Sequence, residues 1–120
     1  MNTLSTISDI IAYGSNSNGS YIKYANGVLI CYGNYDTGNL TGWDTWGGLY
    51  VKSISFGDFP HQFIAPPVIL KTIQRGYSGW IFNDSDSSSS TSWGPVAIMR
   101  PTSGEDTYYK ISLLAIGRWK

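Results

Sequence analysis

The stretch Ser20-Tyr-Ile-Lys-Tyr-Ala-Asn-Gly-Val-Leu-Ile-Cys-Tyr32 contains two runs of β-branched and aromatic residues around a short polar break. Valine, isoleucine and tyrosine fit a pleated, half-buried sheet, so each run is typical of a strand. The break contains Asn26-Gly27, which supplies the positive φ that a tight hairpin turn requires. The stretch therefore predicts a β-hairpin over residues 20–33.

The strand-and-turn pattern continues from this hairpin to the C-terminus. Further strands are predicted at 49–56, 68–73, 80–82, 93–99 and 108–119, while residues 33–48 are rich in Gly, Asp, Asn and Thr and predict a long loop. The apolar spacing at 4–13 suits a short helix or an N-terminal arm. We therefore expect an all-β, antiparallel β-sandwich of about six strands preceded by the hairpin. Residues 1–19 would be an arm or linker, and residues 20–120 a single domain.

The composition limits the classes of partner. Only 13% of the 120 residues are charged and the formal net charge is zero, so nucleic acid and membrane surfaces are not expected partners. Aromatic residues make up 15%, including five Trp and nine Tyr, which suits sugar faces and protein interfaces as well as a core. The sequence shows neither a membrane-spanning run nor a signal peptide, so synthesis in the cytoplasm is expected.

Residue types that carry catalysis are sparse. The single His61 and single Cys31 cannot build a zinc site of the usual kind, and Cys31 is either a buried structural residue or a reactive thiol. Asp84 and Asp86 lack the remaining ligands of an EF-hand, and the adjacent Glu105-Asp106 makes a poor acid/base couple. We expect no catalytic residues, no metal and no cofactor.

Recognition is the function that remains. Aromatic rings stack on sugar C–H faces, and carboxylates, amides and arginine hold sugar hydroxyls. The predicted loops and strand ends contain such groups at Trp43, Asp44, Trp46, Trp80, Asn83, Trp93, Arg100, Tyr108 and Tyr109.

Both ends of the domain resemble a known group of proteins. The hairpin segment 18–33 and the closing segment 109–120 resemble the tail-fibre and receptor-binding proteins of phages and prophages. The segments 54–56, 66–73 and 109–116, with Pro66-Pro67-Val68 as their most specific motif, resemble the H-type lectin domain of snail agglutinins and discoidins. That resemblance implies a six-stranded antiparallel sandwich that forms trimers and binds galactose-type sugars at subunit boundaries.

The lectin resemblance also implies a site. Asp44 of Gly42-Trp43-Asp44 lies near the place of the family's hydroxyl-binding Asp, and Tyr109 matches its site tyrosine. Trp80 stands where the family has an Arg, whereas Arg100 stands where it has a stacking Trp, so the two side chains are exchanged. The exchange either preserves a cation and a ring in one pocket or removes galactose-type binding. Trp43, Trp93 and Tyr108 are secondary candidates.

Three functional hypotheses follow. The first is a phage tail-fibre tip that binds a cell-surface carbohydrate as a homotrimer, in which Asp44, Trp80, Arg100 and Tyr109 contact the sugar. The second is a purely structural trimerisation or attachment domain. The third is a polysaccharide-degrading tail enzyme, which the lack of a carboxylate pair disfavours. In each case the expected location is the virion tail.

Overall fold

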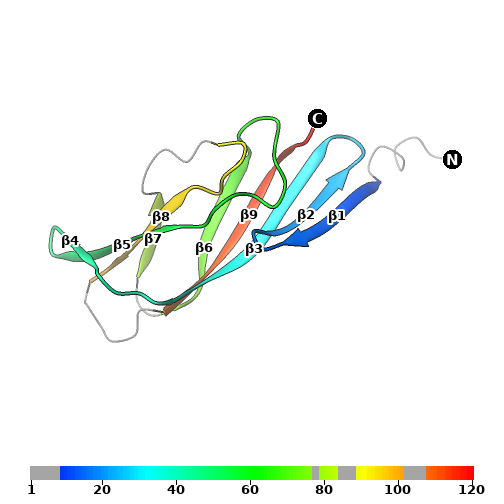
Figure 1. Cartoon of the computed structure of the whole chain (residues 1–120). Coiled ribbons are helices and arrows are strands. Elements are labelled where there is room, and N and C mark those ends of the chain that lie inside the picture. The colour runs from blue at the N-terminus through cyan, green and yellow to red at the C-terminus, as the bar shows by residue number, and fades with distance from the viewer. Residues whose placement is uncertain (1–8, 77–78, 84–88, 102–107) are drawn as a thin grey trace.

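The computed structural model describes residues 9–76, 79–83, 89–101 and 108–120. These residues form nine antiparallel strands and no helix, arranged in two sheets (Figure 1). The five-stranded sheet has the order β1-β2-β3-β9-β6 and the four-stranded sheet the order β4-β5-β8-β7. The strands are β1 (Ile10–Asn16), β2 (Gly19–Tyr24), β3 (Val28–Asn39), β4 (Asp44–Trp46), β5 (Leu49–Ser55), β6 (Val68–Gly76), β7 (Trp80–Asn83), β8 (Pro95–Arg100) and β9 (Tyr108–Arg118).

The predicted hairpin is confirmed as β2 and β3, with Ile22 opposite Ile30. Its three-residue loop ends at Gly27, which has φ 100° and donates its backbone N–H to the carbonyl of Tyr24. The Asn26 side chain accepts the N–H of Val28, which fixes the other half of the turn. A positive φ at the last loop residue is the usual solution for three-residue hairpin loops.

The prediction of a long loop over residues 33–48 is wrong at both ends. β3 continues to Asn39 because β9 runs beside it and supplies hydrogen-bonding partners along its length. At the other end, Asp44–Trp46 forms β4, which turns back into β5 through Gly47 and Gly48. Both glycines have positive φ, as a two-residue type I′ turn requires.

The N-terminal part of the chain also differs from expectation. The helical alternative for residues 4–13 is wrong from residue 10, because β1 begins there and pairs with β2. Ile10–Asn16 are therefore the edge strand of the five-stranded sheet, and residues 4–8 lie outside the described residues. Within the described residues, no helix has the length and apolar character needed to cross a membrane.

The two sheets share one hydrophobic core, which confirms the predicted antiparallel β-sandwich. Its buried side chains come from β3, β5, β8 and β9 and from the connections around residues 56–63 and 93, and they are Leu29, Cys31, Ile54, Phe56, Phe59, Phe63, Trp93, Val96, Ile98, Tyr109, Ile111, Leu113 and Ala115. On β9 the buried residues alternate strictly from Tyr109 to Ala115, so the other face of this strand is turned away from the core.

Cys31 is a buried structural residue, which decides between the two alternatives of a structural residue and a reactive thiol. Its side chain is fully buried and its thiol donates a long contact of 3.8 Å to the carbonyl of His61. Burial raises the pKa of the thiol to about 11, against the lowering effect of that backbone contact. At pH 8 the native thiol is therefore protonated and shielded, and thiolate chemistry is suppressed.

We accordingly expect native Cys31 to resist a thiol-reactive disulfide reagent at pH 8, and denatured protein to react completely. Because the folded pKa is raised, the unfolded state releases its proton first, and stability should fall as the pH rises from about 9 towards 11. Absorbance-monitored labelling with and without denaturant checks this expectation. Rapid labelling of folded protein would contradict the burial.

Candidate functional site

The outer face of the four-stranded sheet carries one row of side chains that spans all four strands. The register places Asp44 opposite Val51, Val51 opposite Met99, and Met99 opposite Trp80. Opposed residues on neighbouring strands project to the same face, so Asp44 and Trp80 share this surface, three strand spacings or about 14 Å apart. Two of the four principal candidates thus lie together on an exposed face.

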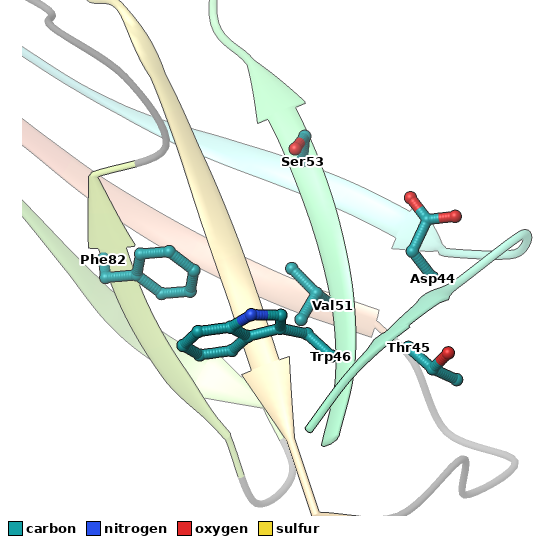
Figure 2. A pocket seen from close by; sticks show the side chains of 6 residues that line it. All are labelled: Asp44, Thr45, Trp46, Val51, Ser53 and Phe82. Atoms are coloured by element: carbon teal, nitrogen blue, oxygen red, sulfur yellow. The ribbon is translucent and has the colours of Figure 1, made fainter. Parts of the chain in front are cut away.

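A pocket of about 310 Å³ lies on this face, lined by Asp44, Thr45, Trp46, Val51, Ser53 and Phe82. Figure 2 shows the Trp46 indole reaching across the sheet above Val51 towards the Phe82 ring, with the Asp44 carboxylate and the Ser53 hydroxyl near the opposite end. Trp46 is 65% exposed and Phe82 is also exposed. The pocket therefore combines open aromatic surface with a carboxylate and a hydroxyl.

Such a combination can bind a sugar ring by two kinds of contact. The exposed faces of Trp46 and Phe82 offer flat apolar area for the C–H side of a pyranose. Asp44 accepts hydrogen bonds from vicinal hydroxyls, and Ser53 can both donate and accept. Trp80, which is 58% exposed, extends the aromatic surface along the same row.

Arg100 lies on the opposite face of the same sheet. It follows Met99 on β8 and pairs with Tyr50, so it projects inwards, and it is only 4% exposed. Its guanidinium carbon lies 5.7 Å from the centroid of the Trp43 ring and 5.9 Å from that of Tyr109. These distances are typical of cation–π contacts. Within one chain the structure therefore does not bring Arg100 together with Trp80.

Tyr109 belongs to this inner cluster too. Its side chain is fully buried, and a Cβ added to Gly79 would come within 3.1 Å of its hydroxyl oxygen, so the hydroxyl lies beside the residue that precedes β7. Burial raises the pKa of Tyr109, partly offset by the nearby Arg100 charge. Trp43 packs against the core and donates its indole N–H to the carbonyl of Leu40 at 3.1 Å. Both residues thus pack into the core between the two sheets.

The two remaining secondary candidates have structural contacts. Trp93 is fully buried, packs edge-on against Phe59 with ring centroids 4.8 Å apart, and donates its indole N–H to the carbonyl of Asn18. A sugar cannot reach it in this fold. The hydroxyl of Tyr108 donates to the Asp36 carboxylate at 2.9 Å, across the β3–β9 pair.

The site that the lectin resemblance implies includes neither Trp46 nor Phe82. Trp46 was expected in a long loop, but the Gly47-Gly48 turn folds it back over β5. Phe82 lies two residues after Trp80 on the same strand, so it projects to the same face. A Gly-Gly pair between Trp46 and an alternating strand was the signal that could have located the pocket.

Four acidic residues that the sequence offered for metal binding or acid/base chemistry lie outside the described residues; they are Asp84, Asp86, Glu105 and Asp106. Among the residues described, no cluster of three or more His, Cys, Asp or Glu side chains could hold a metal ion. The ring of His61 packs against Tyr21 with centroids 5.1 Å apart, and its Nδ1 lies 2.8 Å from the carbonyl oxygen of Gln62.

Two solved structures share this fold. An N-truncated R1-type pyocin tail fibre superposes with a TM-score of 0.52 at 18% sequence identity, covering 98% of each chain. A C-terminal portion of the R1 pyocin fibre of P. aeruginosa superposes with a TM-score of 0.51 at 16% identity, covering 89% of this chain and 28% of that one. The chain spans little more than a quarter of that longer fibre. No family model and no curated protein matches the sequence.

The comparison confirms the tail-fibre resemblance at the level of the fold. Both matched structures are pyocin tail fibres, and the N-truncated one is matched over nearly its whole length. The chain therefore shares the fold of these pyocin tail-fibre structures. The likeness to H-type lectins stays a prediction.

Proposed function

We propose that this chain is the receptor-binding tip of a phage-type tail fibre and that it recognises a cell-surface glycan as a homotrimer. The observation that carries the proposal is the exposed pocket of Trp46, Phe82, Asp44 and Ser53 on the outer face of the four-stranded sheet. A tail-fibre fold supports this role because a fibre tip is the part of a virion tail that meets the cell surface. Its expected location is accordingly the virion tail.

Low charge argues for a neutral ligand at this site. Among the described residues that line the pocket, Asp44 is the one ionisable side chain, and the remaining lining is aromatic, aliphatic or hydroxylic. A neutral hexose or an N-acetylated amino sugar fits such a surface, since it presents an apolar face to the rings and hydroxyls to the carboxylate. Shallow single sites bind weakly, and a trimer would compensate because linked sites raise the avidity by orders of magnitude.

The polysaccharide-degrading alternative is not favoured. Glycoside hydrolysis normally uses two carboxylates about 5–10 Å apart, one on each side of the scissile bond. Asp44 is the sole carboxylate among the described residues that line the pocket. We therefore infer binding without bond cleavage.

The structural alternative, a trimerisation or attachment domain without sugar binding, has one specific observation in its favour. The outer face of the five-stranded sheet exposes large apolar side chains, among them Val68, Leu70 and Ile116. Such a surface is typical of a contact between protein chains. It lies on the other sheet from the pocket, so assembly and sugar binding use separate surfaces and do not compete.

The Trp46→Ala variant tests the proposal on a glycan array or on host-wall polysaccharide. We expect binding to weaken by about tenfold or more, because truncating an aromatic anchor at the centre of a binding surface removes its largest apolar contact. Because Trp46 is exposed, the melting temperature should stay within a few degrees of wild type.

Thr41→Ala is the matched control. It shortens an exposed side chain that lies just before β4 and does not line the pocket. We expect its binding to match wild type within about twofold. Equal binding by wild type and Trp46→Ala would remove the site assignment, and absence of any saccharide binding by wild type would favour the purely structural role.

A further inference from the structure

The outer face of the five-stranded sheet carries an apolar row that crosses every strand. The register joins Val68 to Ile116, Ile116 to Ile30, Ile30 to Ile22, and Ile22 to Tyr13. Opposed residues project to the same face, and the alternate residues of β3 and β9 are those buried in the core. The row therefore faces away from the core.

A second row lies next to it. Leu70 is opposite Leu114, and Leu114 is opposite Tyr32, so the apolar surface is two rows deep over three strands. Tyr13 and Val68 are the most exposed large hydrophobic side chains of the described residues, at 79% and 71%. An apolar side chain left this open in an isolated chain indicates that another surface covers it.

The size of this face approaches that of a protein interface. Five strands at about 4.8 Å spacing give a width of roughly 24 Å, and strand lengths of about 25 Å give a face of roughly 600 Å². A standard interface buries about 800 Å² per partner, so a face of this area, with its two apolar rows, is close to the size needed for a contact between subunits.

Charge indicates what kind of partner covers it. The row on one side of the apolar rows is polar and uncharged: Ser112 donates to Asn34 at 3.2 Å or to Gln74 at 3.1 Å. On the other side Arg118 stands opposite Val28, and its guanidinium donates to the backbone carbonyls of Asn26 and Lys120. The chain as a whole has a formal net charge of zero, so copies of it do not repel one another. A strongly charged partner would find no complementary groups on the two apolar rows. A second copy of this chain, in contrast, would bring apolar side chains of its own to them.

The two edges of the face differ, because one carries a hollow and the other an exposed aromatic ring. At the β6 edge a pocket of about 290 Å³ is lined by Ile64, Ala65, Pro66, Pro67, Val68, Ile116, Gly117 and Arg118. At the β1 edge the Tyr13 ring protrudes at the far end of the same row. A protrusion and a hollow at opposite ends of one row can meet only between different copies. Head-to-tail contacts of this kind close into a ring when the rotation permits.

We propose that the outer face of the five-stranded sheet binds a second copy of this chain head-to-tail, with Tyr13 of one copy seated in the Ile64–Val68–Ile116 hollow of the next. Three such contacts close the ring. The inference rests on the assembly part of the proposed function and names the surface responsible. It is independent of the sugar pocket, which lies on the other sheet.

A double-cysteine variant, Tyr13→Cys with Val68→Cys, tests the contact. The two positions lie four strand spacings apart in one chain, about 19 Å, and a disulfide bridges Cα atoms no more than about 7 Å apart. Any disulfide between them must therefore join two copies. Buried Cys31 is not expected to take part. Mild oxidation should give covalent trimers on a denaturing gel, while each single-cysteine variant should stay monomeric on that gel.

A second variant, Val68→Asp, checks the assembly without crosslinking. Val68 is exposed, so the variant should keep the wild-type circular dichroism spectrum, while sedimentation should show a shift from trimer to monomer. A wild type that sediments as a monomer, or a Tyr13→Cys variant that crosslinks to itself alone, would overturn the head-to-tail contact. A monomeric Val68→Asp that still binds sugar per subunit would leave the proposed glycan site intact, so the two proposals fail separately.

Discussion

Replacing Trp93 with alanine is expected to destabilise the fold by about 3–5 kcal/mol, the usual cost of truncating a buried aromatic residue. Trp93 is fully buried, packs against Phe59, and holds the carbonyl of Asn18 through its indole N–H. Alanine leaves a cavity and an unsatisfied carbonyl together. For a domain of this size the melting temperature should fall by roughly 10–20 °C, measurable by thermal circular dichroism.

Trp93→Phe is the matched control for this prediction. It keeps a ring against Phe59 and loses the hydrogen bond to Asn18, so about 1–2 kcal/mol should be lost. A Trp93→Ala protein with wild-type stability and reduced sugar binding would contradict the structural assignment and return Trp93 to the binding surface.

Removing both exposed indoles, in Trp46→Ala with Trp80→Ala, is expected to abolish measurable sugar binding, with a loss of about a hundredfold or more if each indole contributes as an aromatic anchor. The two side chains project from the outer face of the four-stranded sheet, on β4 and β7 at its two edges. A single replacement leaves one aromatic platform in place. Titration calorimetry or surface binding to the polysaccharide measures the loss.

The stability of this double variant is part of the same prediction. Neither indole is buried, so thermal unfolding should resemble that of wild type. The exposed surface becomes less apolar, and solubility should not fall. A collapse in stability would show that the rings support the sheet, and retained affinity would place the sugar elsewhere.

Much of the fold could be predicted from local sequence. The Asn26-Gly27 turn and the alternating runs on either side located β2 and the start of β3, and the Pro66-Pro67 pair marked the beginning of β6. In each case, neighbouring residues in the sequence indicate the strand, either through a turn motif or through an alternation of period two. Residues 34–39 and 44–46 could not be placed in this way, because their strand state depends on pairing with β9 and β5.

The candidate site was predictable only in part. Asp44 and Trp80 were named from residue type and resemblance, and both lie on the exposed face. Arg100 and Tyr109 were named in the same way and lie between the sheets, because a shift of one residue along a strand moves a side chain to the other face. Residue type cannot distinguish these faces without the register. The apolar rows of the five-stranded sheet were hidden for the same reason.

The most direct measurement of the central claim is a heteronuclear NMR titration of the five tryptophan indole N–H signals with the cell-surface polysaccharide. The proposal predicts that the signals of Trp46 and Trp80 shift or broaden, because these rings are exposed on the outer face of the four-stranded sheet. The signals of Trp43 and Trp93 should stay unchanged, since both N–H groups are bonded to backbone carbonyls. Perturbation confined to Trp43 and Trp93, or none at all, would contradict a sugar site on that face.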